Sequence, residues 1–431
     1  MPRSGHKHEE RRHGAERIRV SSLERVLLEA SSKEADQSAV NIGGLFLFDG
    51  TPPVLEDLRR LLTGQAGQAP VLGYKLSSGA THWERDPAFQ AGRHVQELQA
   101  RPGTDVLAAA QQAVAQPFDR GRPMWRLVLI HGYSATEYAL CYCAHHAYQD
   151  GLAIEGTIQA LFGAGTLPEP AGNELSAKVR PWNWPAPRKL GFPLAPTFDW
   201  SVTRRPLTGQ RKVLSFDLDQ AALQDITRAT GASRNQVCLA TLAGALSDWT
   251  PGDWATPTRR ARRGPHIGMP LNLRSAESSA CLGNQFGMMR LPLPCHRPCP
   301  VDQLTDVMRR TGARQLQRQR EIHASFQRLP GFVVRPMARR STHPRYLTMG
   351  VSTVRTDRIT VAGTEVRAIF ALPPLLPGHH MMIVLFQYGD QVTPTLIFDG
   401  AIGDADRLER LWQRSLIRLR DALDTKGSLG R

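Results

Sequence analysis

A proline-rich stretch near the middle of the chain limits how this sequence can fold. Residues 163–210 contain eight prolines, and proline interrupts helices and central strands because it lacks a backbone N–H and fixes φ. We therefore predict a linker over residues 163–210 that joins two lobes, 19–162 and 211–431, after a disordered polar tail over residues 1–18. With 431 residues, 41% of them hydrophobic, the chain is long enough for a core in each lobe.

Strand and helix patterns occur in both halves of the chain, without strict alternation. Apolar runs bounded by turn residues predict strands at residues 41–50, 124–130, 138–144, 212–218, 266–271, 287–293, 346–354, 365–371, 381–388 and 395–398. Capped or amphipathic segments predict helices at residues 22–29, 51–62, 104–114, 154–161, 220–230, 234–246, 301–320 and 404–423. Residues 124–130 and 138–144 are expected to form a hairpin. This mixture predicts an α/β (α+β) fold of two lobes with mixed sheets.

Arginine carries most of the positive charge of the chain. The formal net charge is +15, and only seven of the 54 basic residues are lysines. A guanidinium group binds two phosphate oxygens at once, so an anionic partner is one expectation, and a bias spread over the whole chain is the alternative. The arginines lie in scattered pairs, such as Arg204-Arg205 and Arg339-Arg340, and form no stripe interleaved with aromatic residues. Nucleic acid is therefore not an expected partner.

The cysteines and the first residues bear on the cellular compartment. Six cysteines are present, at positions 141, 143, 238, 281, 295 and 299. The charged start MPRSGHKHEERRH lacks the apolar core of a signal peptide. No apolar run approaches the roughly eighteen residues that a membrane span needs. We therefore expect free thiols and a cytoplasmic protein, with peripheral contact at a membrane as an open alternative.

The sequence HHAYQDG, residues 145–151, follows the strand predicted at 138–144. Side chains alternate faces along a strand, so His145 and His146 are expected to point in opposite directions, and only one of them can face a given cleft. A neutral imidazole can take a proton from a hydroxyl and return it to a leaving group. Asp150 could hold the loop by bonding to an arginine or to backbone amides, and Gly151 allows a close approach. A histidine satisfied within a core is the alternative interpretation.

A metal site is a weaker interpretation of the same segment. Cys141, Cys143 and His145 alternate along one strand face, but a tetrahedral zinc site needs ligands that converge from several directions. No later Cys-x-x-Cys or His-x-x-x-His supplies partners, and Cys295-x-x-x-Cys299 is a weak candidate. We expect no metal here.

Several segments resemble motifs of one enzyme family. Residues 145–151 match the HHxxxDG motif of the coenzyme A-dependent acyltransferase superfamily, which includes the condensation domains of peptide synthetases. PFDRGRPMWR at 117–126 resembles the PLDxxRPLW segment of bacterial wax ester synthase/diacylglycerol acyltransferases (WS/DGAT). Further segments resemble motifs of this family in the same order: SRNQVCLA at 233–240, PLNLR at 270–274, LGNQ at 282–285 and LLPGHHMMI at 375–383. The resemblance covers nearly the whole chain.

The resemblance implies two lobes of chloramphenicol-acetyltransferase type, with a tunnel between them and His146 at its middle. It implies that His146 is the general base for an acceptor hydroxyl, which attacks an acyl thioester directly, and that His145, Asp150 and Gly151 complete the catalytic motif. No Gly-x-Ser-x-Gly elbow for an acyl-enzyme is present. Asp150 is expected to pair with Arg274 from the second lobe. The tunnel is expected to include Trp125, Asn235, Gln236, Asn272, Asn284, Ser352, Thr353, His379 and His380.

The resemblance implies acyl-coenzyme A as co-substrate, no permanently bound cofactor, and an ester of the wax or triacylglycerol type as product. However, Gln236 replaces an aspartate of the family, residues 351–357 lack its asparagine and prolines, and His379-His380 is unusual for a lipid channel. The pair could instead lie in a solvated loop. An acyltransferase of specialised metabolism, with a donor on an acyl carrier protein and a polar hydroxyl or amine as acceptor, is therefore an alternative. A catalytically silent binding module is a second alternative, which the intact motif disfavours.

Overall fold

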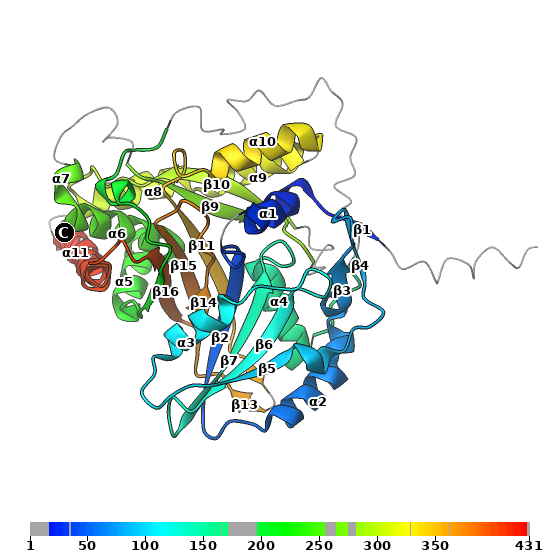
Figure 1. The fold of residues 1–431 in the computed structure, drawn as a ribbon. Helices are drawn as coiled ribbons and strands as arrows, with labels where there is room; N and C mark the ends of the chain where they lie inside the picture. Colours follow the sequence, from blue (N-terminus) through cyan, green and yellow to red (C-terminus); the bar gives the residue numbers. More distant parts are fainter. Residues whose placement is uncertain are drawn as a thin grey trace, which may run out of the picture.

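A computed structural model describes residues 17–33, 36–163, 165–170, 196–254, 264–274, 282–327, 329–361 and 363–428. These residues form two lobes, each built around a mixed sheet (Figure 1). The predicted α/β fold of two lobes with mixed sheets is confirmed. Most of the predicted tail, the linker residues 171–195 and Cys281 lie outside the described part of the chain. No helix in that part is long and apolar enough to cross a bilayer.

The sheet of the N-terminal lobe has five strands in the order β14-β2-β7-β6-β5. Its strands are β2 (Asn41–Asp49), β5 (Val95–Gln99), β6 (Trp125–His131), β7 (Glu137–His145) and β14 (Ala368–Leu372). β7 is antiparallel to β2 and β6, so the predicted hairpin is present, and β5 runs parallel to β6. Both faces of β7 are buried: Cys141 and Cys143 face one hydrophobic core, and Tyr142 and Ala144 face another. This explains why the strand is continuously apolar in sequence.

The sheet of the C-terminal lobe has six strands in the order β10-β9-β11-β15-β16-β8. Its strands are β8 (Arg211–Ser215), β9 (His266–Asn272), β10 (Phe286–Pro292), β11 (Met349–Thr356), β15 (Met381–Tyr388) and β16 (Gln391–Asp399). β11 is parallel to both of its neighbours, and the other pairs are antiparallel. Short strands form two smaller sheets: β1 (Ile18–Arg19), β3 (Tyr74–Leu76) and β4 (His82–Arg85) in one, and β12 (Thr360–Val361) and β13 (Thr364–Glu365) in the other.

Helices cover the sheets and line the space between the lobes. Those before the linker are α1 (Ser22–Lys33), α2 (Leu55–Gln65), α3 (Val106–Val114) and α4 (Gly151–Phe162). Those after it are α5 (Gln220–Thr230), α6 (Arg234–Trp249), α7 (Pro251–Trp254), α8 (Pro300–Arg310), α9 (Ala313–Gln327), α10 (Gly331–Thr342) and α11 (Arg407–Ser428). α5, α6 and α11 lie on the outer side of the C-terminal lobe in Figure 1, where Trp412 and Leu416 of α11 are fully buried in its core.

One strand crosses from the second half of the chain into the first lobe. β14 is antiparallel to β2, with Ile369 opposite Phe46, and so forms an edge of the N-terminal sheet. The chain leaves the C-terminal sheet after β11 and returns to that sheet for β15. The two lobes therefore share a strand.

Several elements differ from the sequence prediction. The predicted helix 301–320 is wrong: it is two helices, α8 and α9, which separate at Thr311, whose hydroxyl is bonded to Gln236 of α6 (3.0 Å). α10 and the strands β1, β3, β4 and β5 were not predicted, because the strands are short and α10 contains Pro336. Ile18, placed at the end of the tail, pairs with Trp83 in a sheet.

Candidate active site

A cavity of about 570 Å³ lies between the lobes. The N-terminal lobe contributes α1, β2 and α4 to its wall, and the second half of the chain contributes β9, β10, β11, β14 and β15 with the helices α9 and α10. Many of the lining side chains are apolar, among them Leu27, Phe46, Ile158, Phe326, Val334 and Phe386. A cavity of this size and polarity suits a long apolar group with a few polar atoms.

His146 brings a basic group into this wall. β7 ends one residue earlier, and the backbone N–H of His146 donates to the Val40 carbonyl (3.1 Å). The imidazole is partly exposed in the cavity, with its ring centroid 5.9 Å from that of Phe286. Burial lowers the pKa of His146, against the opposing effects of its own carbonyl, the Asp150 charge and Asn284. The ring is therefore neutral at neutral pH and able to accept a proton.

His145 does not line the cavity, and its imidazole is hydrogen-bonded to Ser31 of α1. Its Nδ1 accepts from the Ala147 N–H (3.1 Å), so its proton is assigned to Nε2, which donates to the Ser31 hydroxyl (2.9 Å). That hydroxyl donates to carbonyls of α1 and accepts from Arg120 (2.9 Å). Burial lowers the pKa of His145 to about 3, and Arg120 and His146 add to the effect. His145 is thus a neutral side chain that fixes the end of β7.

The carboxylate of Asp150 has partners from both lobes. Its Oδ1 caps α4 by accepting from the Ala153 N–H (3.0 Å). Its Oδ2 accepts from Arg274 Nη1 (2.7 Å) and from the Gln285 N–H (3.3 Å). The structure thus places Arg274 against Asp150, the partner that the sequence analysis expected. With its oxygens engaged in this way, Asp150 positions the start of α4 against the C-terminal lobe.

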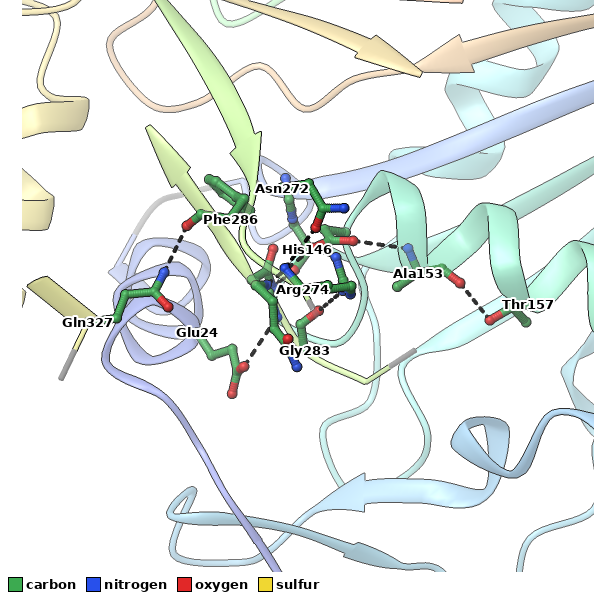
Figure 2. A network of polar contacts seen from close by, with 12 residues as sticks. Glu24, His146, Ala153, Thr157, Asn272, Arg274, Gly283, Phe286 and Gln327 are labelled. Atoms are coloured by element: carbon green, nitrogen blue, oxygen red, sulfur yellow. Dashed lines mark hydrogen bonds and ion pairs between the residues drawn. The ribbon is translucent and has the colours of Figure 1, made fainter. Parts of the chain in front are cut away.

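A short segment of the C-terminal lobe, residues 282–285, holds the turn that carries His146 (Figure 2). The Gly283 N–H donates to the Tyr148 carbonyl (2.6 Å), and the Asn284 side-chain amide donates to the His146 carbonyl. Arg274 also donates to the Gly283 carbonyl (3.3 Å). Gly283 has a φ of +75°, a conformation that glycine adopts without steric cost. The backbone of the histidine turn is therefore fixed by the opposite lobe.

Glu24 of α1 supports the same segment and was missed in the sequence analysis. Its carboxylate accepts from the backbone N–H groups of Asn284 (3.2 Å) and Ser21 (2.9 Å) and from the Trp83 indole (3.0 Å). Burial raises the pKa of Glu24, and these hydrogen bonds oppose that effect. The Ser21-x-x-Glu24 spacing is a capping-box signature at the start of α1, and it could have drawn attention to Glu24 as a buried cap.

Besides His146 and Asp150, four of the residues predicted to lie in the catalytic motif or the tunnel line the cavity. Gly151 begins α4, and a Cβ added there would press on Val354. Asn272, Ser352 and Thr353 also line the cavity. Asn235 lies one layer behind, where its Oδ1 accepts from the Thr353 hydroxyl (2.8 Å). A larger side chain at position 151 would therefore narrow the cavity next to the histidine.

The other predicted tunnel residues lie outside the cavity wall. Trp125 is in the core of the N-terminal lobe, stacked on Tyr142 and donating to the Leu72 carbonyl (3.0 Å). Gln236 completes the capping box of α6 and bonds to Thr311 at the end of α8. Having glutamine here instead of the family's aspartate therefore does not change the charge of the cavity wall. Asn284 lies behind His146 rather than beside its ring.

His379 and His380 were expected to line the tunnel or, alternatively, to lie in a solvated loop, and both predictions are wrong. The two residues are buried, at 2% and 6% exposure, and neither lines the cavity. His380 Nε2 bonds to the Arg205 carbonyl (2.7 Å), and Nδ1 of His379 lies 3.4 Å from the Pro377 carbonyl. Burial lowers the pKa of His379 to about 4.

Polar residues of the cavity that the sequence analysis missed come from α4, β10 and α9. Glu155 lies one helical turn after Gly151, and burial raises its pKa. Arg290, His323 and Gln327 line another part of the wall, and burial lowers the pKa of His323 to about 4. Glu155 could have been predicted, because it lies four residues after Gly151 and so on the same face of the helix. No local sequence pattern indicates that Arg290, His323 and Gln327 line the cavity.

Among the described residues, no three His, Cys, Asp or Glu side chains converge as ligands for a metal ion. Cys141 and Cys143 have their sulfurs 3.6 Å apart in the core, and both nitrogens of His145 have other partners. The five cysteines in the described part of the chain are free thiols.

Comparison with known proteins identifies both halves of the chain. Residues 34–181 match the model of the wax ester synthase/diacylglycerol acyltransferase catalytic domain, and residues 282–420 match that of the WS/DGAT C-terminal domain. A probable diacylglycerol O-acyltransferase of Mycobacterium tuberculosis is 21% identical over 422 residues, which cover 88% of this chain and 90% of the relative. The O-acyltransferase WSD of Acinetobacter baylyi is 24% identical over 343 residues, covering 67% of this chain and 70% of the relative.

Solved structures show the same fold. The wax ester synthase/diacylglycerol acyltransferase from Marinobacter aquaeolei VT8 superposes with a TM-score of 0.60 at 17% identity, covering 94% of this chain and all of that one. The first condensation domain of the CDA synthetase gives a TM-score of 0.66 at 14% identity, covering 95% and 96% of the two chains. The starter condensation domain of rhizomide synthetase, solved with C8-CoA, gives 0.63 at 15% identity, covering 94% and 95%.

Proposed function

The chain belongs to the wax ester synthase/diacylglycerol acyltransferase family and is an acyltransferase that forms esters, and on this premise we propose that His146 is its general base. The observation that carries the proposal is the position of this imidazole, neutral and partly exposed in an apolar cavity between the lobes. A base must be deprotonated and within reach of a hydroxyl before it can act.

The proposed reaction is a direct transfer. The acceptor hydroxyl gives its proton to the imidazole of His146 while its oxygen attacks the thioester carbonyl, so that a C–O bond forms and the C–S bond then breaks. The leaving thiolate takes the proton back from the imidazolium, and the products are an ester and a free thiol. No group of the protein is acylated. Positioning the two substrates in one enclosed cavity supplies much of the rate enhancement for such a reaction.

Asp150 and Arg274 are proposed to act as positioning residues. The carboxylate is occupied by Arg274 and by two backbone N–H groups, so it is not free to exchange protons with the substrate. Asn284 holds the carbonyl of His146 from the other lobe. These contacts fix where the imidazole stands, which is the requirement for a general base to meet its substrate.

We propose an acyl-coenzyme A thioester as donor and a lipid hydroxyl, from a fatty alcohol or a diacylglycerol, as acceptor. The largely apolar lining of the cavity supports acyl chains in both substrates, and the names of the relatives point to the same acceptors. The condensation domain solved with C8-CoA supports coenzyme A as the carrier of the donor, and a carrier protein remains the alternative carrier. We propose that the protein is cytoplasmic. We also propose lobes at 19–162 and 211–431, although β14 joins the sheet of the first lobe, and Trp200 and Val202 of the predicted linker pack in the core of the second.

The test is the His146→Gln variant, assayed for thiol release from acyl-coenzyme A and for ester formation with a fatty alcohol. Both are expected to fall by roughly 10²- to 10⁴-fold, the usual contribution of a general base. The matched control is His131→Gln, at the end of β6, where the histidine bonds to Glu97 and neither residue lines the cavity. Ester formation that survives at the wild-type rate in folded His146→Gln protein would refute this role.

A further inference from the structure

α10 has two faces of opposite character. Its inner face lines the cavity with Val334, Ala338 and Ser341. Phe332, Pro336 and Arg339 follow one another at helical spacing on the opposite, exposed face. Figure 1 shows α10 at the edge of the molecule, beside α1, which also lines the cavity. One helix thus separates the substrate cavity from the solvent.

The outer face presents an apolar ring among basic side chains. Phe332 is 76% exposed, the most exposed large apolar side chain among the described residues. Arg339 and Arg340 are exposed two turns further along the helix. Arg339 pairs there with Glu29 of α1, and the Arg340 guanidinium lies 4.2 Å from the centroid of the Tyr346 ring. Residues 313–345, which span α9 and α10, contain eight arginines and a single acidic residue, Glu321. The helix and its surroundings therefore offer a cationic surface with one protruding phenyl ring.

We propose that the outer face of α10 docks on a bilayer surface that contains anionic phospholipid. Phe332 inserts among the acyl chains, and Arg339 and Arg340 lie at the level of the headgroup phosphates. An exposed aromatic ring among arginines is the pattern of an interfacial helix, because burial of the ring and attraction to anionic headgroups add together. The contact places the wall of the cavity against the phase in which lipid substrates dissolve.

A protein partner fits this surface less well. A specific protein interface needs a broad contact with a well-packed apolar centre. Here one ring protrudes, flanked by the exposed Pro330 and Pro336 and by arginines. An acidic carrier protein or the phosphates of coenzyme A could bind the arginines, but neither would require contact with the phenyl ring of Phe332. The role of Phe332 therefore separates the lipid surface from these other anions.

The test is flotation of the whole protein with phosphatidylcholine vesicles, with and without phosphatidylglycerol. We expect binding that requires phosphatidylglycerol and weakens with salt. Phe332→Ala should lower the bound fraction several-fold, and the Arg339→Gln/Arg340→Gln variant should weaken binding by roughly fivefold for each arginine. Matched controls elsewhere on the surface are Val54→Ala, at a site 66% exposed, and Arg60→Gln/Arg228→Gln, whose side chains are 75% and 74% exposed. Neither control should change the binding.

The possible results are decisive in both directions. Absence of wild-type binding, equal losses in the control variants, or full binding by Phe332→Ala would each overturn the proposal. So would a raised KM for acyl-coenzyme A in Arg339→Gln/Arg340→Gln without vesicles, since these arginines would then serve the donor. Vesicle binding requires no turnover, so the His146→Gln variant should bind as the wild type does. The docking surface thus stands or fails separately from the catalytic role of His146.

Discussion

Arg274 and Asp150 lie 124 residues apart in the sequence and form an ion pair between the two lobes, with Nη1 2.7 Å from Oδ2 and each side chain only 8% exposed. Arg274 follows β9 of the C-terminal lobe, and Asp150, four residues after His146, caps α4. The pair therefore ties the position of the histidine turn to the position of the opposite lobe.

Breaking this pair from one side should be costly. Asp150→Asn or Arg274→Met is expected to lower the free energy of unfolding by about 3–5 kcal/mol, because the remaining group stays buried without its partner. The double variant should lose clearly less than the sum of the two. Urea unfolding of the four proteins measures this coupling. The exposed pair Arg228–Asp225 is the matched control, with an expected coupling below about 1 kcal/mol. Additive losses at positions 150 and 274 would contradict the interpretation.

Gly283 should tolerate no side chain. Gly283→Ala combines a backbone at φ +75° with a Cβ that overlaps the Glu24 carboxylate. Gly231→Ala is the matched control, because Gly231 has φ +68° and open space around the added carbon. The backbone strain, roughly 1–2 kcal/mol, is common to both. We expect Gly283→Ala to be less stable by roughly a further 1–3 kcal/mol from overpacking, and to lose acyl transfer. Equal stability and equal activity of the two variants would show that the Glu24 carboxylate moves aside without cost, and would contradict the prediction.

The pH dependence of acyl transfer should report the environment of His146. Burial lowers the pKa of this imidazole below its ordinary value, and only the neutral form accepts a proton. The acidic limb of kcat/KM is therefore expected to bend at a pH below about 6.5, the ordinary pKa of histidine. Initial rates of thiol release between pH 4.5 and 8, roughly the range over which histidine titrates, provide the measurement. A limb centred above the ordinary value would mean that another group controls the step.

Acid sensitivity of the fold should depend in part on His379. Its pKa is lowered to about 4 by burial, so between that value and about 6.5 the unfolded chain binds a proton that the folded chain does not. The stabilisation is complete above about pH 6.5 and is lost as the pH falls towards 4. His379→Leu should reduce the loss of unfolding free energy between pH 7 and pH 5 by about 2 kcal/mol. Urea midpoints at the two pH values measure it.

A third pH supplies the control for His379. Between pH 7 and 8 the residue is mainly neutral in both states, so the gap between wild type and His379→Leu should stay constant there. A gap that is the same at pH 5 as at pH 7 would show that the buried imidazole titrates with the unfolded chain.

The sequence predicts those parts of the fold that are specified locally. The strand that ends at His145 and its hairpin partner are continuous apolar runs, and both are present. The break between α8 and α9 falls at Thr311-Gly312, and this glycine is a local stop signal that the prediction of one continuous helix overlooked. β14 pairs with a strand more than three hundred residues earlier in the chain, which local patterns do not encode.

The candidate site divides in the same way. His146 and Asp150 could be identified because they share one short motif, and the structure places Arg274 beside them. Trp125 was wrongly predicted to line the tunnel, because a sequence pattern does not distinguish an aromatic residue in a core from one in a tunnel wall. His379 was misplaced because its burial results from the packing of distant segments.

β14 also determines when this protein can fold. Its residues follow those of β2 by more than three hundred positions, so a growing chain cannot complete its first sheet until residue 372 has been synthesised. Until then β2 presents an open hydrogen-bonding edge, which invites pairing with other nascent chains. A fragment ending at the linker would keep that edge permanently. The sheet of the first lobe is therefore incomplete without residues from the second half of the chain.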